Sequence, residues 1–330
     1  MSKIDFVVTW VDENDPKWRQ EKETYEKLYG IDSNLNSEER YRDWGIFMYW
    51  FRAVEKYAPW VNRIHFVTEG HVPEWLNTKH DKINIVKHAD FIPAEYLPTF
   101  NSNVIELNLH RIDQLSNEFV LFNDDMILND FVSDIDFFVN HLPCDEGVFS
   151  PIVPARNTIV STVLNNLEII NDYFDSRLIL KQHFWKFFNI KYGKHLIKSF
   201  TVLPWRRVLG FYDSHIPVSH KKENFELLWL KEEGTLQNTS KNKFRTKMDV
   251  NHWLMRYWNL SQGRFIPRST NFGKYYNISD ENKELYRDIS RSHHKVLCLN
   301  DGRVDDFEKI KSELIEVLSQ KFPKKSDFEK

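Results

Sequence analysis

Short apolar runs alternate along the chain with stretches in which apolar residues recur every three or four positions, and this alternation predicts an α/β protein. Runs rich in Phe, Val and Ile predict buried strands, which we place at residues 4–11, 63–68, 82–87, 119–122, 147–153 and 295–299. Helical spacing predicts helices at residues 17–29, 44–58, 102–112, 223–233 and 304–321. Because strands joined by helical crossovers pair in parallel, the pattern predicts a largely parallel, Rossmann-like sheet flanked by helices.

The segment between residues 155 and 213 breaks this alternation, because it is mostly helical in pattern and rich in aromatic and basic residues. We interpret it as a helical insertion that divides an α/β core made of residues 1–154 and 214–330. Polar, turn-forming residues at 234–243 predict a flexible loop, after which residues 244–249 open another helix. The charged residues 321–330 predict a frayed tail.

Composition narrows the class of protein without identifying it. The 330 residues carry a net charge of −3 and no long basic stripe, so nothing favours a nucleic-acid partner. Only two cysteines occur, which argues against a disulfide scaffold, and no Cys/His cluster has zinc spacing. The first strand begins at residue 4 and leaves no room for a signal peptide, and no run of about 20 apolar residues could span a membrane. We therefore expect a cytoplasmic protein, and contact with the inner face of the cell membrane stays open.

Two adjacent carboxylates, Asp124 and Asp125, follow Asn123 at the end of the strand predicted at residues 119–122. Carboxylates are costly to bury without a partner, and at the carboxyl end of a strand they can hold a hard divalent cation through their oxygen atoms. Asn and Asp also favour turns through their own backbone chemistry, and for an isolated Asn-Asp-Asp the turn is the commoner explanation. The residues alone leave both interpretations open.

The first predicted strand carries two further carboxylates. Asp5 lies in an otherwise apolar run, where it needs either neighbouring backbone N–H groups or a ligand, and the two explanations are equally frequent. Asp12 lies in the polar loop that follows this strand. Because ligands of parallel sheets bind outside the carboxyl ends of the strands, we expect Asp12 and the pair Asp124–Asp125 in one crevice.

Three basic side chains are candidates for binding an anion or moving a proton. His215 precedes Ile-Pro, a rigid context suited to proton transfer near neutral pH, although a lone histidine beside proline is more often a capping or core residue. Arg245 precedes a predicted helix start, where backbone N–H groups also favour an anion. Arg42 precedes the helix at residues 44–58 and could reach a phosphate, whereas a solvated loop is the commoner explanation.

Four motifs stand in order along the chain, namely residues 4–12, residues 122–125, His215 with Arg245 and Asp249, and residues 298–301. Together they resemble the four conserved regions of the Stealth family, which comprises hexose-1-phosphate transferases of capsule and surface-polysaccharide synthesis and the lysosomal-enzyme N-acetylglucosamine-1-phosphotransferase. The segments at residues 57–64 and 99–106 are also similar to the family's. The resemblance covers residues 4 to about 302 and implies a GT-A-like form of the α/β fold.

The resemblance also implies roles for individual residues. The catalytic residues that it implies are Asp5, Asp125, His215 and Arg245. The ligands that it implies for Mg²⁺ or Mn²⁺ are Asp124, Asp125 and Asp301. From the motifs and their surroundings together, we expect the substrate-binding residues to be Trp10, Asp12, Arg42, Asn101, Ser102, Asn123, Asp249 and Asn300. One departure is Asp12-Glu13, where the family often has Asn-Gly or Asp-Gly, and this change in the turn weakens the assignment of Asp12.

The reaction implied by the resemblance moves a sugar together with its 1-phosphate. The donor is a nucleotide sugar such as UDP-N-acetylhexosamine or UDP-hexose, the acceptor is a hydroxyl of a glycan or lipid-linked glycan, and a nucleoside monophosphate is released. His215 would be the general base, Arg245 would stabilise the transferred phosphate, and residues 155–213 would select the acceptor. Two alternatives remain, a metal-dependent glycosyltransferase that releases a nucleoside diphosphate and a non-catalytic glycan-binding module that uses the aromatic side chains.

Overall fold

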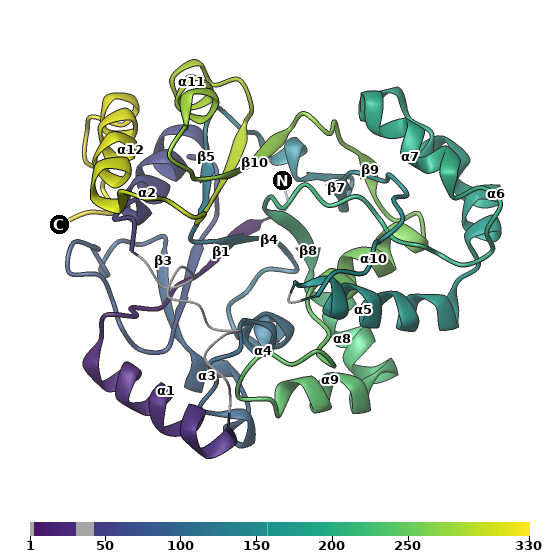
Figure 1. The fold of residues 1–330 in the computed structure, drawn as a ribbon, viewed down its shortest axis with the longest axis horizontal. Helices are drawn as coiled ribbons and strands as arrows, with labels where there is room; N and C mark the ends of the chain where they lie inside the picture. The colour runs from purple at the N-terminus through teal and green to yellow at the C-terminus, as the bar shows by residue number, and fades with distance from the viewer. Residues whose placement is uncertain (1–2, 31–42, 157) are drawn as a thin grey trace.

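The computed structural model describes residues 3–30, 43–156 and 158–330, and a five-stranded sheet forms the centre of this part of the chain (Figure 1). The strand order is β3-β2-β1-β4-β8. The strands are β1 (Ile4–Thr9), β2 (Ile64–Thr68), β3 (Ile83–Lys87), β4 (Glu118–Asn123) and β8 (Val218–Lys221). The first four run parallel, and β8 pairs antiparallel with β4. The predicted α/β fold with a largely parallel sheet is confirmed.

Helices cover both faces of this sheet. Phe6 and Val8 of β1 join an apolar cluster with α2 and α12, whereas Val7 joins a second cluster with α4, α8 and α10, because successive strand side chains point to opposite faces. Two buried faces explain why β1 and β4 are almost continuously apolar.

The α-helices are α1 (Pro16–Tyr29), α2 (Phe47–Tyr57), α3 (His88–Phe91), α4 (Ser102–Asn108), α5 (Val160–Tyr173), α6 (Ser176–Phe187), α7 (Leu196–Thr201), α8 (Lys222–Lys231), α9 (Glu233–Ser240), α10 (Trp253–Ser261), α11 (Lys283–Arg291) and α12 (Phe307–Lys321). Short 3₁₀ helices are η3 (Ala94–Tyr96), η4 (Leu109–Arg111), η5 (Asp134–Asp136) and η6 (Ile190–His195).

A second sheet, ordered β10-β11-β5, begins where β4 ends. The chain leaves β4, turns through Asp124 and Asp125, and enters β5 directly. β11 runs antiparallel to β5 with Cys298 opposite Met126, so the end of β11 returns to this turn. The strands are β5 (Met126–Leu128), β10 (Gly273–Asn277) and β11 (Val296–Asn300), and a third small sheet contains β6 (Phe138–Val139), β7 (Leu142–Asp145) and β9 (Ile266–Pro267).

The segment predicted as a helical insertion carries α5, α6, η6 and α7. In Figure 1, α6 and α7 project from the body of the molecule at the upper right. Their inner side still packs on the central core, because Phe187 and Phe211 belong to the same apolar cluster as Phe119 of β4. Across residues 3–30, 43–156 and 158–330, none of the helices has the length and apolar character that crossing a bilayer would require.

Two local predictions are wrong where packing outweighs local sequence preference. Residues 147–153 form no continuous strand, and Phe149 makes only a single bridge to Phe211. Residues 234–243 were expected to form a loop, but α9 occupies most of this stretch. Leu236 of α9 is fully buried, and its burial compensates for the weak helix propensity of the surrounding Gly, Thr and Asn residues.

The carboxyl-terminal residues are also ordered by contacts rather than frayed. Phe328 is buried against the α2 side of the core. The carboxylate of Glu329 accepts hydrogen bonds from both Nε and Nη2 of Arg52, at 2.8 and 2.7 Å. The backbone N–H of Lys330 donates to the carbonyl of Trp75 at 2.8 Å. A charged composition predicts exposure, but here one aromatic ring and one ion pair fix the tail.

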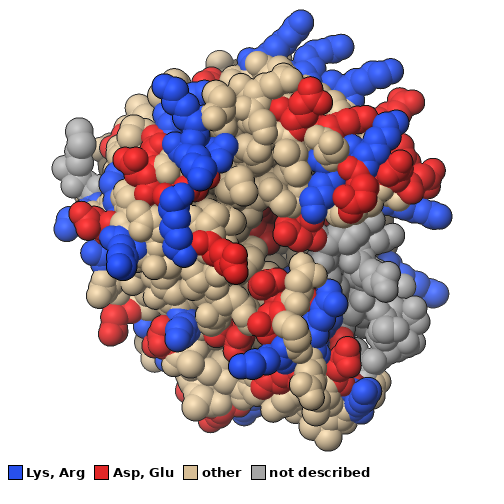
Figure 2. Space-filling view, turned by 90° about the vertical axis from the view of Figure 1, so that its left-hand side faces the viewer, with Lys and Arg blue, Asp and Glu red and all other residues tan. Residues whose placement is uncertain are grey.

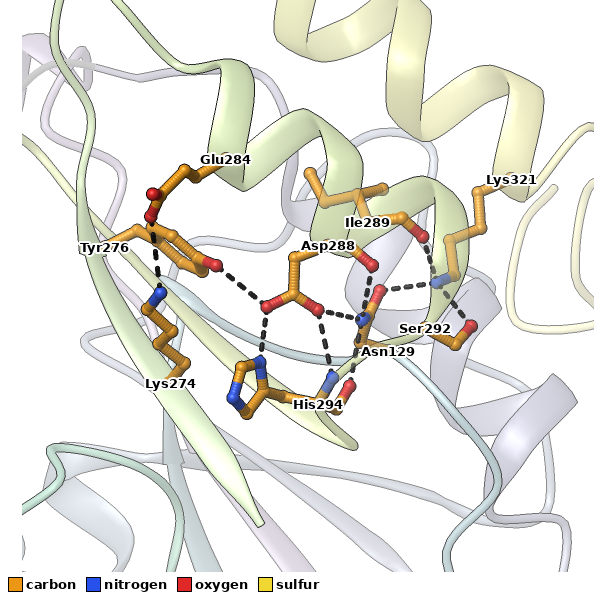
Figure 3. A network of polar contacts seen from close by, with 9 residues as sticks. All are labelled: Asn129, Lys274, Tyr276, Glu284, Asp288, Ile289, Ser292, His294 and Lys321. Carbon is orange, nitrogen blue, oxygen red and sulfur yellow. Dashed lines mark hydrogen bonds and ion pairs between the residues drawn. The ribbon is translucent and has the colours of Figure 1, made fainter. Parts of the chain in front are cut away.

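A buried polar network joins the second sheet to α11 and α12 (Figure 3). Asp288 is its centre: its carboxylate accepts hydrogen bonds from the Tyr276 hydroxyl at 2.8 Å and the His294 backbone N–H at 3.0 Å, and it contacts His294 Nδ1 at 2.5 Å. Asn129 bridges Asp288 to the Lys321 ammonium group. Burial lowers the pKa of Lys321 to about 8. These contacts fix the end of α11 next to β11, whose other end reaches the Asp124–Asp125 turn.

Replacing the centre of this network should destabilise the protein much more than replacing a carboxylate at its edge. Asp288 is 3% exposed, so Asp288→Ala leaves several buried donors without an acceptor and should lower the free energy of unfolding by about 3 kcal/mol. Glu284→Gln is the matched control, because the Glu284 side chain is 80% exposed in its pair with Lys274 and its loss should cost less than about 0.5 kcal/mol. Urea unfolding of both variants measures the difference, and equal losses would contradict it.

Candidate functional site

A cavity of about 1320 Å³ opens where the central sheet meets the second sheet. Ligand pockets commonly measure about 300–1,000 Å³, so this cavity has room for two ligands. Its walls come from the carboxyl ends of β1, β4 and β11, from the loop before β8, and from α4. Of the residues predicted from the sequence, those that line it are Trp10, Asp12, Ser102, Asn123, Asp124, Asp125, His215, Arg245, Asn300 and Asp301. The expectation that Asp12 and the pair Asp124–Asp125 share one crevice is therefore confirmed, and His215, Arg245 and Asp301 line the same cavity.

The Asp124–Asp125 turn lies at the centre of this cavity because β4 ends there and β5 begins. Burial raises the pKa of Asp124 to about 7, and the charge of Asp125 contributes to the increase. Burial also raises the pKa of Asp125, and His215 opposes this increase. Asp125 Oδ1 is buried and has no hydrogen-bond partner among the described residues. The Asp124 side chain is exposed in the cavity wall and Asp125 is half-buried, and two carboxylates with a free oxygen atom between strand ends are an arrangement that a hard divalent cation fits.

Asp125 also belongs to a tighter cluster with His215 and Cys298. One potential ligand atom from each of the three residues lies within 4.8 Å of the others. The Cys298 thiol donates a hydrogen bond to Asp125 Oδ2 at 3.3 Å. Burial, with the charge of Asp125, raises the pKa of Cys298 far above its ordinary value, so the sulfur stays protonated and is a poor metal ligand. The cluster therefore supplies a carboxylate beside an imidazole, with a thiol that orients the carboxylate.

The loop before β8 holds His215 in a strained backbone conformation. The φ angle of His215 is +49°, in the left-handed region that few non-glycine residues occupy. The Asp213 carboxylate accepts a hydrogen bond from the His215 backbone N–H at 2.8 Å and stabilises this turn. Strain of this kind persists only when surrounding contacts impose it, and it concentrates at functional sites. Asp213 was not predicted as a site residue, although an aspartate two residues before the turn residue is the signal of an Asx turn.

Arg245 and α4 form another part of the cavity wall. Its guanidinium Nη2 donates to the Ser102 hydroxyl in the first turn of α4. Glu106, one turn further along, is buried, which raises its pKa to about 7 against the opposing charge of Arg245. Glu106 was not predicted as a site residue from the sequence, and α4 is capped by Asn101, whose side chain accepts a hydrogen bond from the Asn103 backbone N–H.

Asn101 and Asp249 were predicted to bind substrate, but they are fully buried and do not line the cavity. The Asp249 carboxylate accepts hydrogen bonds from Asn101, Asn103 and Asn242, as well as from the Thr246 backbone N–H and hydroxyl. These bonds fold residues 242–249 into a compact loop. Arg245 lies in this loop rather than at a helix start, because α10 begins only at Trp253. Asp249 therefore positions Arg245 indirectly, by fixing the backbone of the loop that carries it.

Residues that follow the carboxyl end of β1 line the cavity, and one of them was not predicted as a site residue. Trp10 lines the cavity and stacks on Phe47 with 6.0 Å between ring centroids. Glu13, noted in the sequence only as a departure, also lines the cavity. Burial raises its pKa to about 8, against the charge of Lys22, and its Oε2 has no partner among the described residues. Arg42 lies outside the described residues.

Asp5 lies at the amino end of β1, and the cavity is at the carboxyl end, so the prediction that it touches substrate is not met by its position. Its carboxylate accepts hydrogen bonds from Asn62 at 2.6 Å and from the Ser116 backbone N–H at 2.8 Å, and it contacts His65 Nε2 at 3.1 Å. Burial raises the pKa of Asp5, but these contacts outweigh it and hold the pKa below its ordinary value. Asp5 therefore joins β1, β2 and the start of β4.

Comparison with known proteins gives full-length matches. The family model described as Stealth protein CR1, conserved region 1, matches residues 2–30, and that described as Stealth protein CR2, conserved region 2, matches residues 40–144. The chain is 56% identical over 331 residues to a capsular polysaccharide phosphotransferase WcwK of Streptococcus pneumoniae, covering 100% of this chain and 99% of that protein. It is 41% identical over 330 residues to the exopolysaccharide phosphotransferase cps2G of Lactiplantibacillus plantarum, covering 99% and 96%. The receptor polysaccharide phosphotransferase WefC of Streptococcus oralis is 38% identical over 333 residues, with both chains covered completely.

Solved structures resemble this chain more distantly. The apo structure of the bifunctional glycosyltransferase WbbM aligns with a TM-score of 0.40 at 10% identity, covering 96% of this chain and 50% of that one. The galactosyltransferase LgtC in complex with donor and acceptor sugar analogues also aligns with a TM-score of 0.40, at 11% identity, covering 96% and 95%.

Asp5→Asn should test whether this carboxylate supports the fold or the chemistry. Loss of the buried charge should lower the free energy of unfolding by about 2–4 kcal/mol at neutral pH. Because the folded-state pKa is depressed, the contribution of Asp5 is complete above its ordinary value of 3.8, and the difference from wild type should shrink as the pH falls from about 5 to about 3. Urea unfolding across this range measures it, with the exposed Asp81→Asn as control. Unchanged stability with abolished turnover would contradict the structural role.

Proposed function

We propose that this chain, which belongs to the Stealth family of capsular and exopolysaccharide phosphotransferases, transfers a sugar-1-phosphate from a nucleotide sugar to a hydroxyl group of a glycan. One observation carries the proposal: a single cavity of about 1320 Å³ brings together a carboxylate pair, an imidazole and a guanidinium from distant parts of the chain. These are the groups needed to neutralise a diphosphate, accept a proton and stabilise the charge on a transferred phosphate.

In the proposed reaction, the acceptor oxygen attacks the phosphorus atom next to the sugar. The bond between this phosphorus and the oxygen that bridges the two phosphates breaks, and the nucleoside monophosphate leaves with that oxygen. The hydroxyl proton passes to a base of the protein. The anomeric C–O bond is never broken, so the product is a phosphodiester with the anomeric configuration of the donor.

His215 is the base in this proposal. Its imidazole is held in the cavity by the strained Asp213–His215 turn and lies beside Asp125. The rings of Trp253 and Tyr275 lie 6.1 and 5.5 Å from the imidazole, centroid to centroid, and limit its orientation. A fixed imidazole that is accessible from the cavity is what general base catalysis requires.

Arg245 takes the charge of the transferred phosphate. It lines the same cavity as His215 and is anchored through Ser102 and through the loop centred on Asp249. A guanidinium on a fixed loop is pre-oriented for phosphate oxygens, so little reorganisation is needed as charge develops. On the same wall, the buried carboxyl group of Glu106 restrains Arg245 electrostatically.

Asp124, Asp125 and Asp301 would hold Mg²⁺ or Mn²⁺, and the free Oδ1 of Asp125 is the observation that fits such an ion. The ion, when bound, would neutralise the diphosphate of the donor. His215 lies close enough to Asp125 to be considered a ligand as well. We assign it to the proton instead, because oxygen ligands suit these hard cations better than a nitrogen ligand does.

The identity of the released nucleotide tests the proposed reaction against ordinary glycosyl transfer. Incubation of the purified protein with a panel of UDP-sugars, Mn²⁺ and a polysaccharide acceptor should release UMP and leave the sugar attached through phosphate. Release of UDP would mean that the sugar moves without its phosphate and would refute the proposal. Chromatography of the nucleotide and phosphorus NMR of the product provide the two measurements.

His215→Ala is the control variant for this assay. Loss of the base should reduce turnover on the order of 10²–10⁴-fold while donor binding is retained. Because His215 is a proton acceptor and not a metal ligand in this proposal, the variant should bind Mn²⁺ as tightly as the wild type. Near-normal turnover would rule out the base, and loss of Mn²⁺ binding would reassign His215 to the metal.

Metal binding should be required for turnover and should weaken in acid. Excess EDTA should abolish turnover, and Mg²⁺ or Mn²⁺ should restore it. Because the pKa of Asp124 is raised to about 7, protons compete with the cation, and Mn²⁺ affinity should fall about tenfold between about pH 8 and about pH 6. Calorimetric titration measures this, and Asp124→Asn should weaken binding and flatten the profile. Full turnover in EDTA would contradict the role of the metal.

A further inference from the structure

The outer surface of α6, η6 and α7 carries only one sign of charge. Between residues 176 and 212 there is no Asp or Glu. The same stretch contains Arg177, Lys181, Lys186, Lys191, Lys194, Lys198, Arg206 and Arg207. The chain as a whole has 45 basic and 48 acidic residues, so positive charge is concentrated here. By contrast, Lys and Arg are interspersed with Asp and Glu on the face shown in Figure 2, which is the side of the molecule away from α6 and α7.

The same surface is unusually rich in exposed apolar side chains. Scattered exposed apolar residues are normal in folded proteins, but a concentration of them indicates a surface that something covers. Trp185 is 78% exposed and Ile190 is 92% exposed. Of the 18 large exposed apolar side chains in the described part of the chain, eight lie within residues 178–205, namely Leu178, Phe184, Trp185, Ile190, Ile197, Phe200, Leu203 and Trp205.

Ring and backbone contacts connect the elements that carry these side chains. Phe184 stacks on Phe188 at 4.5 Å, and Phe188 packs against Phe200 at 4.9 Å, which joins α6 to α7. The loop around Trp205 folds back on the start of α6, where the Ser176 hydroxyl donates to its carbonyl. The helices α6 and α7 and the loop around Trp205 thus carry apolar rings and basic side chains in one part of the molecule. We call this surface, residues 177–206, the basic–aromatic surface.

The basic–aromatic surface reaches the rim of the cavity. Lys194 and His195, at the end of η6, line the cavity that contains Asp125 and His215. The Tyr212 ring contacts the His195 ring at 4.4 Å and immediately precedes the loop that holds His215. An object bound to this surface would therefore lie next to the mouth of the site.

We infer that the basic–aromatic surface docks on an anionic lipid bilayer. Several Lys and Arg side chains attract a surface of anionic headgroups, and the indole rings of Trp prefer the boundary between headgroups and acyl chains. Exposed Ile, Leu and Phe side chains then enter this boundary, where they leave water. An acidic protein partner would also match the charge, and vesicles that contain no protein separate the two occupants. Docking would place the cavity mouth at the headgroup layer, where the glycan of a lipid-linked acceptor is found.

Vesicle binding by the full-length protein tests this inference without any turnover, so its outcome is independent of the proposed reaction. The protein should cosediment with vesicles of phosphatidylcholine mixed with phosphatidylglycerol, and much less with vesicles of phosphatidylcholine alone. Binding should weaken as salt increases, because the Debye length shortens from about 10 Å at 0.1 M to about 3 Å at 1 M. Absence of binding to the anionic vesicles at low salt would overturn the inference.

Two variants separate the apolar and electrostatic contributions. Trp185→Ser with Ile190→Ser should weaken vesicle binding at least about tenfold, and Lys181→Glu with Lys191→Glu should do the same through charge. Leu230→Ser is the matched control, because Leu230 is 82% exposed on α8, outside the basic–aromatic surface, and it should bind like the wild type. Unfolding midpoints equal to that of the wild type would show that the variants are folded.

Sedimentation velocity distinguishes a membrane from a second copy of the chain as the occupant of this surface. If the wild type were a dimer and the Trp185→Ser, Ile190→Ser variant a monomer, the surface would be an interface between copies and the membrane inference would be wrong. Equal binding of wild type and both double variants to anionic vesicles would also overturn it, because the attachment would then lie elsewhere.

Discussion

The structure of the site depends on the electrostatic repulsion between two carboxylates placed side by side at the end of β4. Asp124 and Asp125 are the two residues of the turn that connects β4 to β5. Burial and the charge of Asp125 raise the pKa of Asp124 to about 7, so holding both negative charges side by side in this turn is costly. The pair is surrounded by a thiol from β11 and an imidazole from the loop before β8, and Oδ1 of Asp125 has no hydrogen-bond partner among the described residues.

A second set of charged residues, outside the cavity lining, fixes the position of the His215 imidazole. Arg256 of α10 forms a two-point ion pair with Asp145 of β7 and donates to the carbonyl of Tyr212 at 2.9 Å. Glu146 accepts from the Ser214 hydroxyl at 2.7 Å. These bonds fix the residues on both sides of Asp213 and so impose the left-handed conformation of His215. A buried ion pair contributes little net stability, and its value here is geometric.

The two walls of the cavity are built by the same means from different elements. On one side the Arg256–Asp145 pair supports His215, and on the other Asp249 gathers the amides that fold the loop around Arg245. The groups that face the cavity are half-buried (His215) or exposed (Arg245), whereas the groups that fix them are buried. This division explains why short motifs contain both kinds of residue: Asp249 and Asn101 are needed for the site although neither reaches it.

The sequence by itself determined the α/β class, the parallel direction of the early strands and the polar residues that follow them. Apolar periodicity and the polar breaks after β1, β4 and β11 are local signals, so they can be read from the sequence. It also identified His215, Arg245 and the carboxylate pair as chemical groups. Only the tertiary structure separated groups that face the cavity, such as Asp125, from carboxylates in the same motifs that support it, such as Asp5 and Asp249. It also revealed Asp213 and Glu106, and showed that residues 234–243 are helical. The reason is that the pKa, the exposure and the partners of a side chain are set by residues far away in the chain, which no local pattern contains.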